Sequence, residues 1–141
     1  MARVTGRGEV LVDTSVWIDH LRGVTGPEQD ALDALLRRRG SAVTDVVLLE
    51  VLAEPTDEVE ADRLRRFLAG ARHLHQLSPR DVEDAAALHR ACRRGGETVR
   101  SLNDCIIAAV ALRHGVPVLH RDHDFDVIAR HNRLLTTRSP P

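Results

Sequence analysis

The amino-acid sequence predicts one α/β domain with a mostly parallel sheet of about five strands, flanked by helices on both faces. Three observations lead to this prediction. Short apolar runs alternate with longer amphipathic segments, which is the pattern of strands joined by crossover helices. The chain has 141 residues and is 43% hydrophobic, which suits a single compact core. Glycine and proline stand between the segments, where they end helices and form turns.

The elements of the first half follow from these signals in chain order. The first apolar run is short and ends at Asp13, which indicates a strand. The second helix is amphipathic, with a row of leucines on one face, and Gly40 follows it as a C-cap. We expect, in order, a strand over 9–12, helices over 14–21 and 28–39, a strand over 41–44, and helices over 45–53 and 58–69.

The second half continues the alternation. Gly95 and Gly96 end one long helix, and Gly115 ends a strongly apolar one. We expect a strand over 73–77, a helix from 78 to about 94, a helix over 102–114, a strand over 116–120, a helix over 122–130 and a fifth strand over 133–135. The predicted domain therefore spans 9–136, with an N-terminal extension over 1–8 and a C-terminal tail over 137–141.

The composition excludes several classes of function. All 20 basic residues are arginines, so mechanisms that need a lysine, such as P-loop phosphate binding or Schiff-base chemistry, are excluded. The two cysteines, Cys92 and Cys105, form no disulfide framework and are expected to be core thiols. No apolar run is long enough to cross a bilayer, and no secretory signal precedes the first strand. A cytoplasmic protein with no membrane partner is the expectation.

Four carboxylates stand where apolar strands or helices meet loops: Asp13, Glu50, Asp104 and Asp122. Sites in open parallel sheets form outside the carboxyl ends of the strands, which is where Asp13 and Asp122 are expected. Clustered carboxylates repel one another strongly unless a cation lies among them. The sequence therefore predicts a divalent-metal site, and cleavage of a phosphodiester is the simplest use of such a metal.

Each acid also has a purely structural interpretation. Asp13 and Asp122 are suitable helix N-caps, and Ser101 with Asp104 resembles a capping box. In this interpretation Glu50 is a surface residue. Its segment is otherwise wholly apolar, however. A carboxylate there is either buried, at a cost in free energy, or directed into a polar site. A further alternative is a zinc cluster formed by His114, His120, His123 and Asp124.

Four motifs resemble those of PIN-domain ribonucleases of the VapC toxin type. They are LVDTSVWIDHLRG at 11–23, LEVL at 49–52, NDCIIAA at 103–109 and HRDHDF at 120–125. Their order and spacing agree over about 9–135. The resemblance implies a PIN-like fold and an endoribonuclease dependent on Mg²⁺ or Mn²⁺. It also implies a homodimer inhibited by a cognate VapB-type antitoxin.

The resemblance also assigns roles to individual residues. It implies that Asp13, Glu50, Asp104 and Asp122 are the catalytic, metal-binding acids. Asp124 matches a position that is acidic in many members, so the fourth ligand is either Asp122 or Asp124. Thr14 or Ser15 would hold a water molecule or a phosphate oxygen.

Arginine is the expected means of holding RNA, because a guanidinium binds a phosphate through two hydrogen bonds. Arg22 follows the first motif, Arg100 precedes the third and Arg121 lies within the fourth. Two other functions stay open at this point. One is an aspartyl phosphotransferase or receiver with Asp13 as acceptor, although those families usually need a lysine. The other is a non-catalytic PIN-like partner-binding regulatory module.

Overall fold

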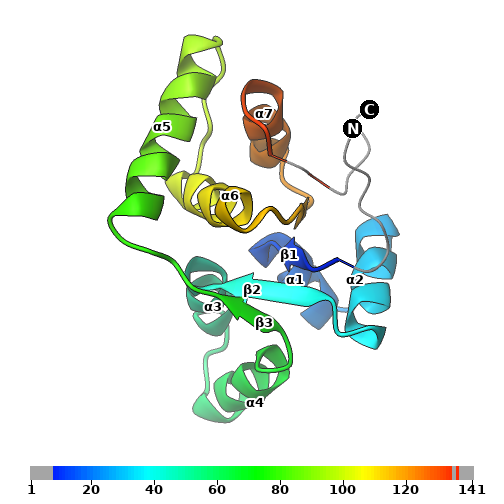
Figure 1. Ribbon diagram of the computed structural model, residues 1–141. Coiled ribbons are helices and arrows are strands. Elements are labelled where there is room, and N and C mark those ends of the chain that lie inside the picture. Colours follow the sequence, from blue (N-terminus) through cyan, green and yellow to red (C-terminus); the bar gives the residue numbers. More distant parts are fainter. Residues whose placement is uncertain (1–7, 135, 137–141) are drawn as a thin grey trace.

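The computed structural model describes residues 8–134 and 136 (Figure 1). Within this part, the sheet has four strands in the order β3-β2-β1-β4. The strands are β1 (Val10–Val12), β2 (Ser41–Thr44), β3 (Arg72–Leu74) and β4 (Val118–Leu119). All three pairings are parallel, and Leu11 at the centre pairs with Ala42 on one side and Val118 on the other. The predicted parallel α/β fold is therefore confirmed.

Helices connect the strands as the alternation predicts. They are α1 (Thr14–Leu21), α2 (Pro27–Arg37), α3 (Asp45–Leu52), α4 (Glu58–Leu68), α5 (Arg80–Arg94), α6 (Leu102–His114) and α7 (His123–His131). Helices α5, α6 and α7 pack together on one side of the sheet, whereas α3 and α4 lie on the other (Figure 1). Gly115 ends α6 with a left-handed backbone (φ +64°), a conformation that glycine adopts without strain. In the described part of the chain, no helix is both long enough and apolar enough to span a membrane.

The core lies between the sheet and the helices. The three residues of β1 are at most 1% exposed, as expected for a central strand covered on both faces. Trp17 is also buried, and its indole N–H donates to the carbonyl of Val12 at 3.1 Å. Cys92 and Cys105 are fully buried free thiols, which confirms their expected place in the core.

Three strand predictions differ from the structure by more than one residue. The expected strand over 73–77 is shortened to Arg72–Leu74, because the backbone N–H groups of Gln76 and Leu77 donate to carboxylates of Asp45 and Asp81 and not to a ladder. The expected strand over 116–120 shortens to Val118–Leu119, because Pro117 has no N–H to donate to a ladder. The expected strand over 133–135 is wrong for Arg133 and Leu134, which are not extended in a ladder, and Leu135 lies outside the described residues. A single parallel bridge joins Val118 to Thr136 instead. The predicted tail over 137–141 and residues 1–7 of the predicted extension also lie outside the described residues.

Candidate active site

The carboxylates that the sequence singles out come from four different elements. Asp13 follows β1 directly and is the N-cap of α1, and Asp122 is the N-cap of α7 after β4. Asp104 lies in the first turn of α6, and Glu50 lies on α3. Because β1 and β4 are neighbours and both end at the same edge of the sheet, Asp13 and Asp122 are brought to one place.

Asp104 is at the centre of the acidic cluster. Carboxylate oxygens of Asp104, Asp122 and Asp124 lie within 4.8 Å of one another. Asp104 is only 6% exposed, and the carboxylates of Asp122 and Asp124 lie beside it. Its Oδ2 atom is buried and has no hydrogen-bond partner. A buried carboxylate oxygen without a donor is costly, so this atom has the environment of a ligand for a cation.

The electrostatics of the site follow from burial and from mutual repulsion. Burial raises the pKa of Asp104 to about 9, and the charges of Asp13, Asp122 and Asp124 add to the shift. Burial also raises the pKa of Asp13, to about 6, although hydrogen bonds from Ser15 oppose the change. Without a cation, this cluster therefore retains a proton on Asp104 at neutral pH.

Two hydroxyl groups hold the acids in place. The Ser15 hydroxyl donates to Asp13 Oδ2 at 2.7 Å, and the Ser15 backbone N–H donates to the same oxygen at 3.3 Å. The Thr14 hydroxyl donates to Glu50 Oε1 at 3.1 Å, which links α1 to α3 across the site. Thr14 and Ser15 therefore contact acids of the site, and the role expected for one of them in holding a water molecule or a phosphate oxygen stays a prediction.

Asp124 has different surroundings from the other acids. Its carboxylate accepts hydrogen bonds from the backbone N–H groups of Arg100, at 3.1 and 3.2 Å, and Ser101, at 3.1 Å. These groups belong to the segment that leads into α6, which carries Asp104. Asp124 is 5% exposed, so its charge is satisfied mainly by these backbone donors.

The structural interpretation of the acids holds for some of them. Asp13 accepts from Ser15 and Asp122 accepts from the Asp124 backbone N–H at 2.9 Å, so both are N-caps as well as members of the site. The capping box does not form, because the side chain of Ser101 makes no capping hydrogen bond. Capping therefore does not explain Asp104.

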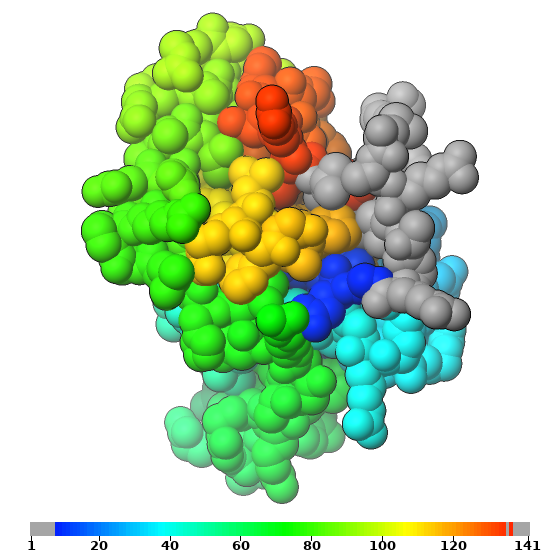
Figure 2. All heavy atoms as spheres, in the orientation of Figure 1, coloured from blue at the N-terminus to red at the C-terminus, as the bar shows by residue number. Residues whose placement is uncertain are grey.

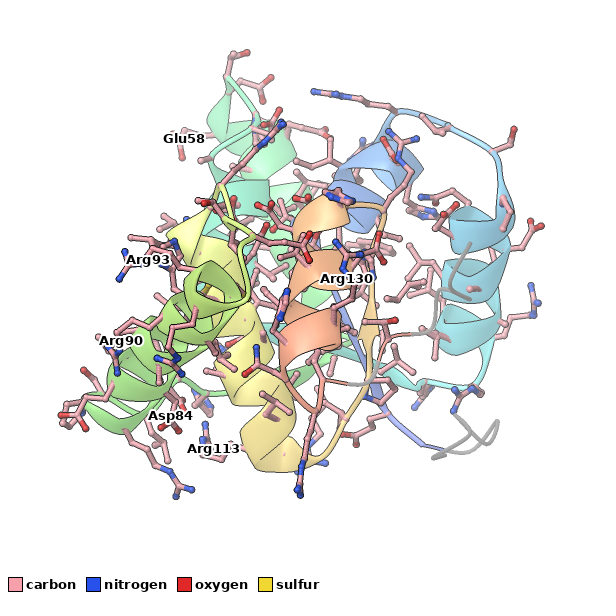
Figure 3. The ribbon with its side chains drawn as sticks, turned by 90° about the horizontal axis from the view of Figure 1, so that it is seen from above. Glu58, Asp84, Arg90, Arg93, Arg113 and Arg130 are labelled. Atoms are coloured by element: carbon pink, nitrogen blue, oxygen red, sulfur yellow. The ribbon has the colours of Figure 1, made fainter. Side chains whose placement is uncertain are left out.

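The three arginines expected to hold RNA are placed differently. Arg121 pairs with Asp19 at 3.2 Å, and Arg22 at the end of α1 pairs with Glu54 at 3.4 Å. Arg100 has an exposed side chain next to the backbone that binds Asp124. Further arginines of α5, Arg90 and Arg93, project away from that helix into solvent (Figure 3).

Sequence reasoning missed two residues that support the site. His120 is fully buried, and its Nδ1 accepts the Asp122 backbone N–H at 3.3 Å, which orients the chain at Asp122. Asp19 holds Arg121 beside the site and is itself 9% exposed. Asp19 stands six residues after Asp13, a spacing that does not place two residues on one helix face, so the sequence offered no local signal for its role.

The histidine zinc cluster does not form. Among the described residues, convergent metal-binding side chains occur in two groups, and neither contains His114, His120 or His123. One group is Asp104, Asp122 and Asp124, which offers only oxygen atoms. Oxygen donors and a partnerless buried oxygen fit a hard divalent cation such as Mg²⁺ or Mn²⁺, which prefer carboxylate ligands.

The fold and site define a class of α/β domain with an acidic centre at the carboxyl edge of a parallel sheet. The PIN domain family matches residues 10–131, and this chain belongs to that family. Within the family it is similar to the VapC ribonucleases. VapC ribonuclease Mb1587 of Mycobacterium bovis is 39% identical over 127 residues, which cover 89% of this chain and 95% of that protein. Ribonuclease VapC51 of Mycobacterium tuberculosis is 32% identical over 120 residues, which cover 84% of each chain.

Solved structures support the fold. The structure of VapBC2 from Rickettsia felis bound to a DNA fragment from its promoter superposes with a TM-score of 0.71 at 15% identity, covering 90% of this chain and 96% of that chain. FitAcB from Neisseria gonorrhoeae gives a TM-score of 0.70 at 21% identity, covering 92% and 96%. The predicted PIN-like fold is thereby confirmed.

Proposed function

We propose that this protein is a divalent-metal-dependent endoribonuclease that acts as the toxin of a toxin–antitoxin pair. The observation that carries the proposal is the buried, partnerless Oδ2 of Asp104 among carboxylates at the carboxyl edge of the sheet. Similarity to proteins named VapC ribonucleases supports RNA as the substrate. With a formal net charge of −1, the chain has no overall attraction for RNA, so contact depends on local arginines.

Each acid has a role in this proposal. Asp13, Asp104 and Asp122 would hold Mg²⁺ or Mn²⁺, with Glu50 oriented toward them by Thr14. When bound, the cation lowers the pKa of water and neutralises charge on the phosphate. Ser15 fixes the Asp13 carboxylate, and burial of Asp13 and Asp104 keeps bulk water from screening their charges. Arg100 and Arg121 lie next to Asp124 and Asp122 and would bind phosphates of the RNA.

We also infer two protein partners. Structural neighbours include a toxin–antitoxin complex from Klebsiella pneumoniae, which supports a VapB-type antitoxin for this chain. A homodimer is supported by two large apolar side chains that face solvent, Leu49 on α3 (68% exposed) and Leu102 on α6 (63% exposed). These two helices contact each other, and we infer that one partner surface covers both leucines.

The experiment that tests the function measures cleavage of purified cellular RNA by the purified chain, followed by mapping of new 5′ ends. We expect discrete cuts with Mg²⁺ or Mn²⁺, none after chelation, and none with Asp13→Asn. Exposed Asp84 on α5 provides the control, because Asp84→Asn leaves the acidic cluster intact. Metal binding without cleavage of any RNA would favour the non-catalytic partner-binding module instead.

Asp122 and Asp124 have different surroundings, because Asp122 caps α7 and Asp124 accepts hydrogen bonds from the backbone before α6. We propose that Asp122 is the fourth ligand and that Asp124 holds the α6 N-terminus. Asp124→Asn should then lower the free energy of unfolding by about 1–3 kcal/mol, because it weakens hydrogen bonds to a charged acceptor.

The matched variant is Asp122→Asn, which keeps the N-cap because asparagine caps helices as well as aspartate. It should lose metal affinity without losing stability, because it also removes a charge that opposes Asp13 and Asp104. Urea denaturation and calorimetric titration with Mn²⁺ measure the two effects. The assignment is reversed if Asp124→Asn keeps its stability and loses metal affinity.

A further inference from the structure

A second group of metal-binding side chains lies at the edge strand of the sheet. It consists of Asp45, the first residue of α3, and His73 and His75, which lie in β3 and just after it. One carboxylate oxygen and two imidazole nitrogens of this group lie within 4.8 Å of one another. His75 follows the last residue of β3, and its imidazole ring stacks on that of His73.

The geometry of the group is already close to that of a metal site. Asp45 Oδ1 is hydrogen-bonded to His73 Nε2 at 2.5 Å, and the two imidazole rings are 4.1 Å apart between centroids. A tetrahedral ion with bonds of roughly 2.0–2.1 Å to nitrogen and oxygen separates its ligand atoms by about 3.4 Å. The two rings are stacked with an interplanar angle of 22°, so the imidazoles must rotate and the ligand atoms must move closer before an ion can replace the shared proton.

The carboxylate is held in the orientation that a ligand needs. Asp45 Oδ2 accepts the backbone N–H of Gln76 at 3.1 Å, which leaves Oδ1 directed toward His73. Support of a ligand by an outer hydrogen bond is typical of metal sites. The group is open to solvent, with side-chain exposures of 45% for Asp45 and 33% for His73. In Figure 2 the green atoms of β3 and of the segment after it lie at the surface.

We propose that Asp45, His73 and His75 form a second cation site, selective for Zn²⁺ and similar borderline transition-metal ions. Imidazole suits such ions, whereas Mg²⁺ prefers oxygen ligands. The two sites of this chain differ in their donors, because the Asp104 cluster offers only carboxylates and this one offers two nitrogens and one oxygen. A bound ion would link the edge strand β3 to the start of α3, the helix that carries Glu50, and would stabilise the native state by mass action.

The test is a titration of the tag-free, full-length chain with Zn²⁺, followed by NMR of its eight histidine side chains. We expect stoichiometric Zn²⁺ to shift the imidazole signals of His73 and His75. Binding at the acidic cluster would shift His120 and His123 instead. If His73 and His75 do not shift at stoichiometric Zn²⁺, the proposal is overturned.

Calorimetry separates the two sites further. In an Asp104→Asn background, which disables the acidic cluster, we expect one equivalent of Zn²⁺ to bind. Adding His75→Asn should weaken that binding by more than about tenfold. The control is His89→Asn, which changes a histidine of α5 that belongs to neither group of metal-binding side chains. It should leave the affinity for Zn²⁺ unchanged. The His75 side chain is exposed and stacks on His73, so its replacement tests coordination with little effect on the core. Equal affinity in the His75→Asn and His89→Asn variants would contradict the proposal.

Discussion

Replacing Asp104 with asparagine should abolish RNA cleavage and should also stabilise the metal-free protein. Asparagine keeps the shape of the side chain but removes the charge that a cation needs and that Asp13, Asp122 and Asp124 oppose. At pH 7 the gain in the free energy of unfolding should be on the order of 2–4 kcal/mol, from the shift of the Asp104 pKa and allowing for coupling among the acids. If Asp104→Asn gains stability and loses activity, the loss of activity is not caused by a loss of the fold.

The pH dependence of stability tests the same point. The pKa of Asp104 rises from 3.8 to about 9 on folding, so the native state binds the extra proton between these values. The free energy of unfolding of the metal-free protein should therefore fall as the pH rises from 3.8 to about 9. Between pH 3.8 and about 6, the raised pKa of Asp13 should make this fall steeper.

Denaturation with urea across this pH range, in the presence of a chelator, measures the slope. Asp104→Asn should flatten it above pH 6, and Asp84→Asn should match the wild type. Saturating Mn²⁺ should also remove the fall in the wild type, because the cation replaces the proton. An unchanged slope in Asp104→Asn would contradict the assignment of the proton to this residue.

Replacing Asp81 with alanine should lower the free energy of unfolding by about 3–5 kcal/mol, because it leaves Arg113 without its buried partner. The Asp81 side chain is fully buried and accepts from Arg113 Nε at 2.9 Å and Nη2 at 3.0 Å, and from the Leu77 backbone N–H at 2.6 Å. Burial raises its pKa, but these hydrogen bonds outweigh burial and hold the pKa below its ordinary value. Arg113 also donates to the carbonyl of His75, so the pair joins α5, α6 and the end of β3.

The control is Asp84→Ala on the same helix, whose pairing with Arg80 is exposed and 3.9 Å long. Exposed pairs of this kind contribute about 0–1 kcal/mol. In Figure 3, Asp84 on α5 and Arg113 on α6 are labelled at the lower left. Urea denaturation at pH 7 measures both variants. Because the Asp81 pKa is depressed, its contribution should disappear as pH falls below the ordinary range of a carboxylate. A loss below 1 kcal/mol for Asp81→Ala would show that the pair is not needed for the fold.

The elements of this chain could be read from local patterns. Strand β1 is a short apolar run before a capping aspartate, and α6 is an apolar helix that ends at a glycine with positive φ. Both patterns involve only residues that are close in sequence, so they can be recognised without knowing how the rest of the chain packs. The strand expected over 133–135 is wrong for Arg133 and Leu134, because pairing depends on a partner strand from a distant part of the chain.

The sequence by itself determined the order of the elements, the family motifs and the candidate acids Asp13, Glu50, Asp104 and Asp122. Only the tertiary structure decided what each acid contacts: that Asp104 retains a buried oxygen without a donor, and that Asp124 binds the backbone before α6. It also brought Asp45 to His73 and His75 across two strands. The physical reason is that burial and hydrogen bonding between segments depend on how the chain packs, whereas sequence patterns report only the nearest turns and faces.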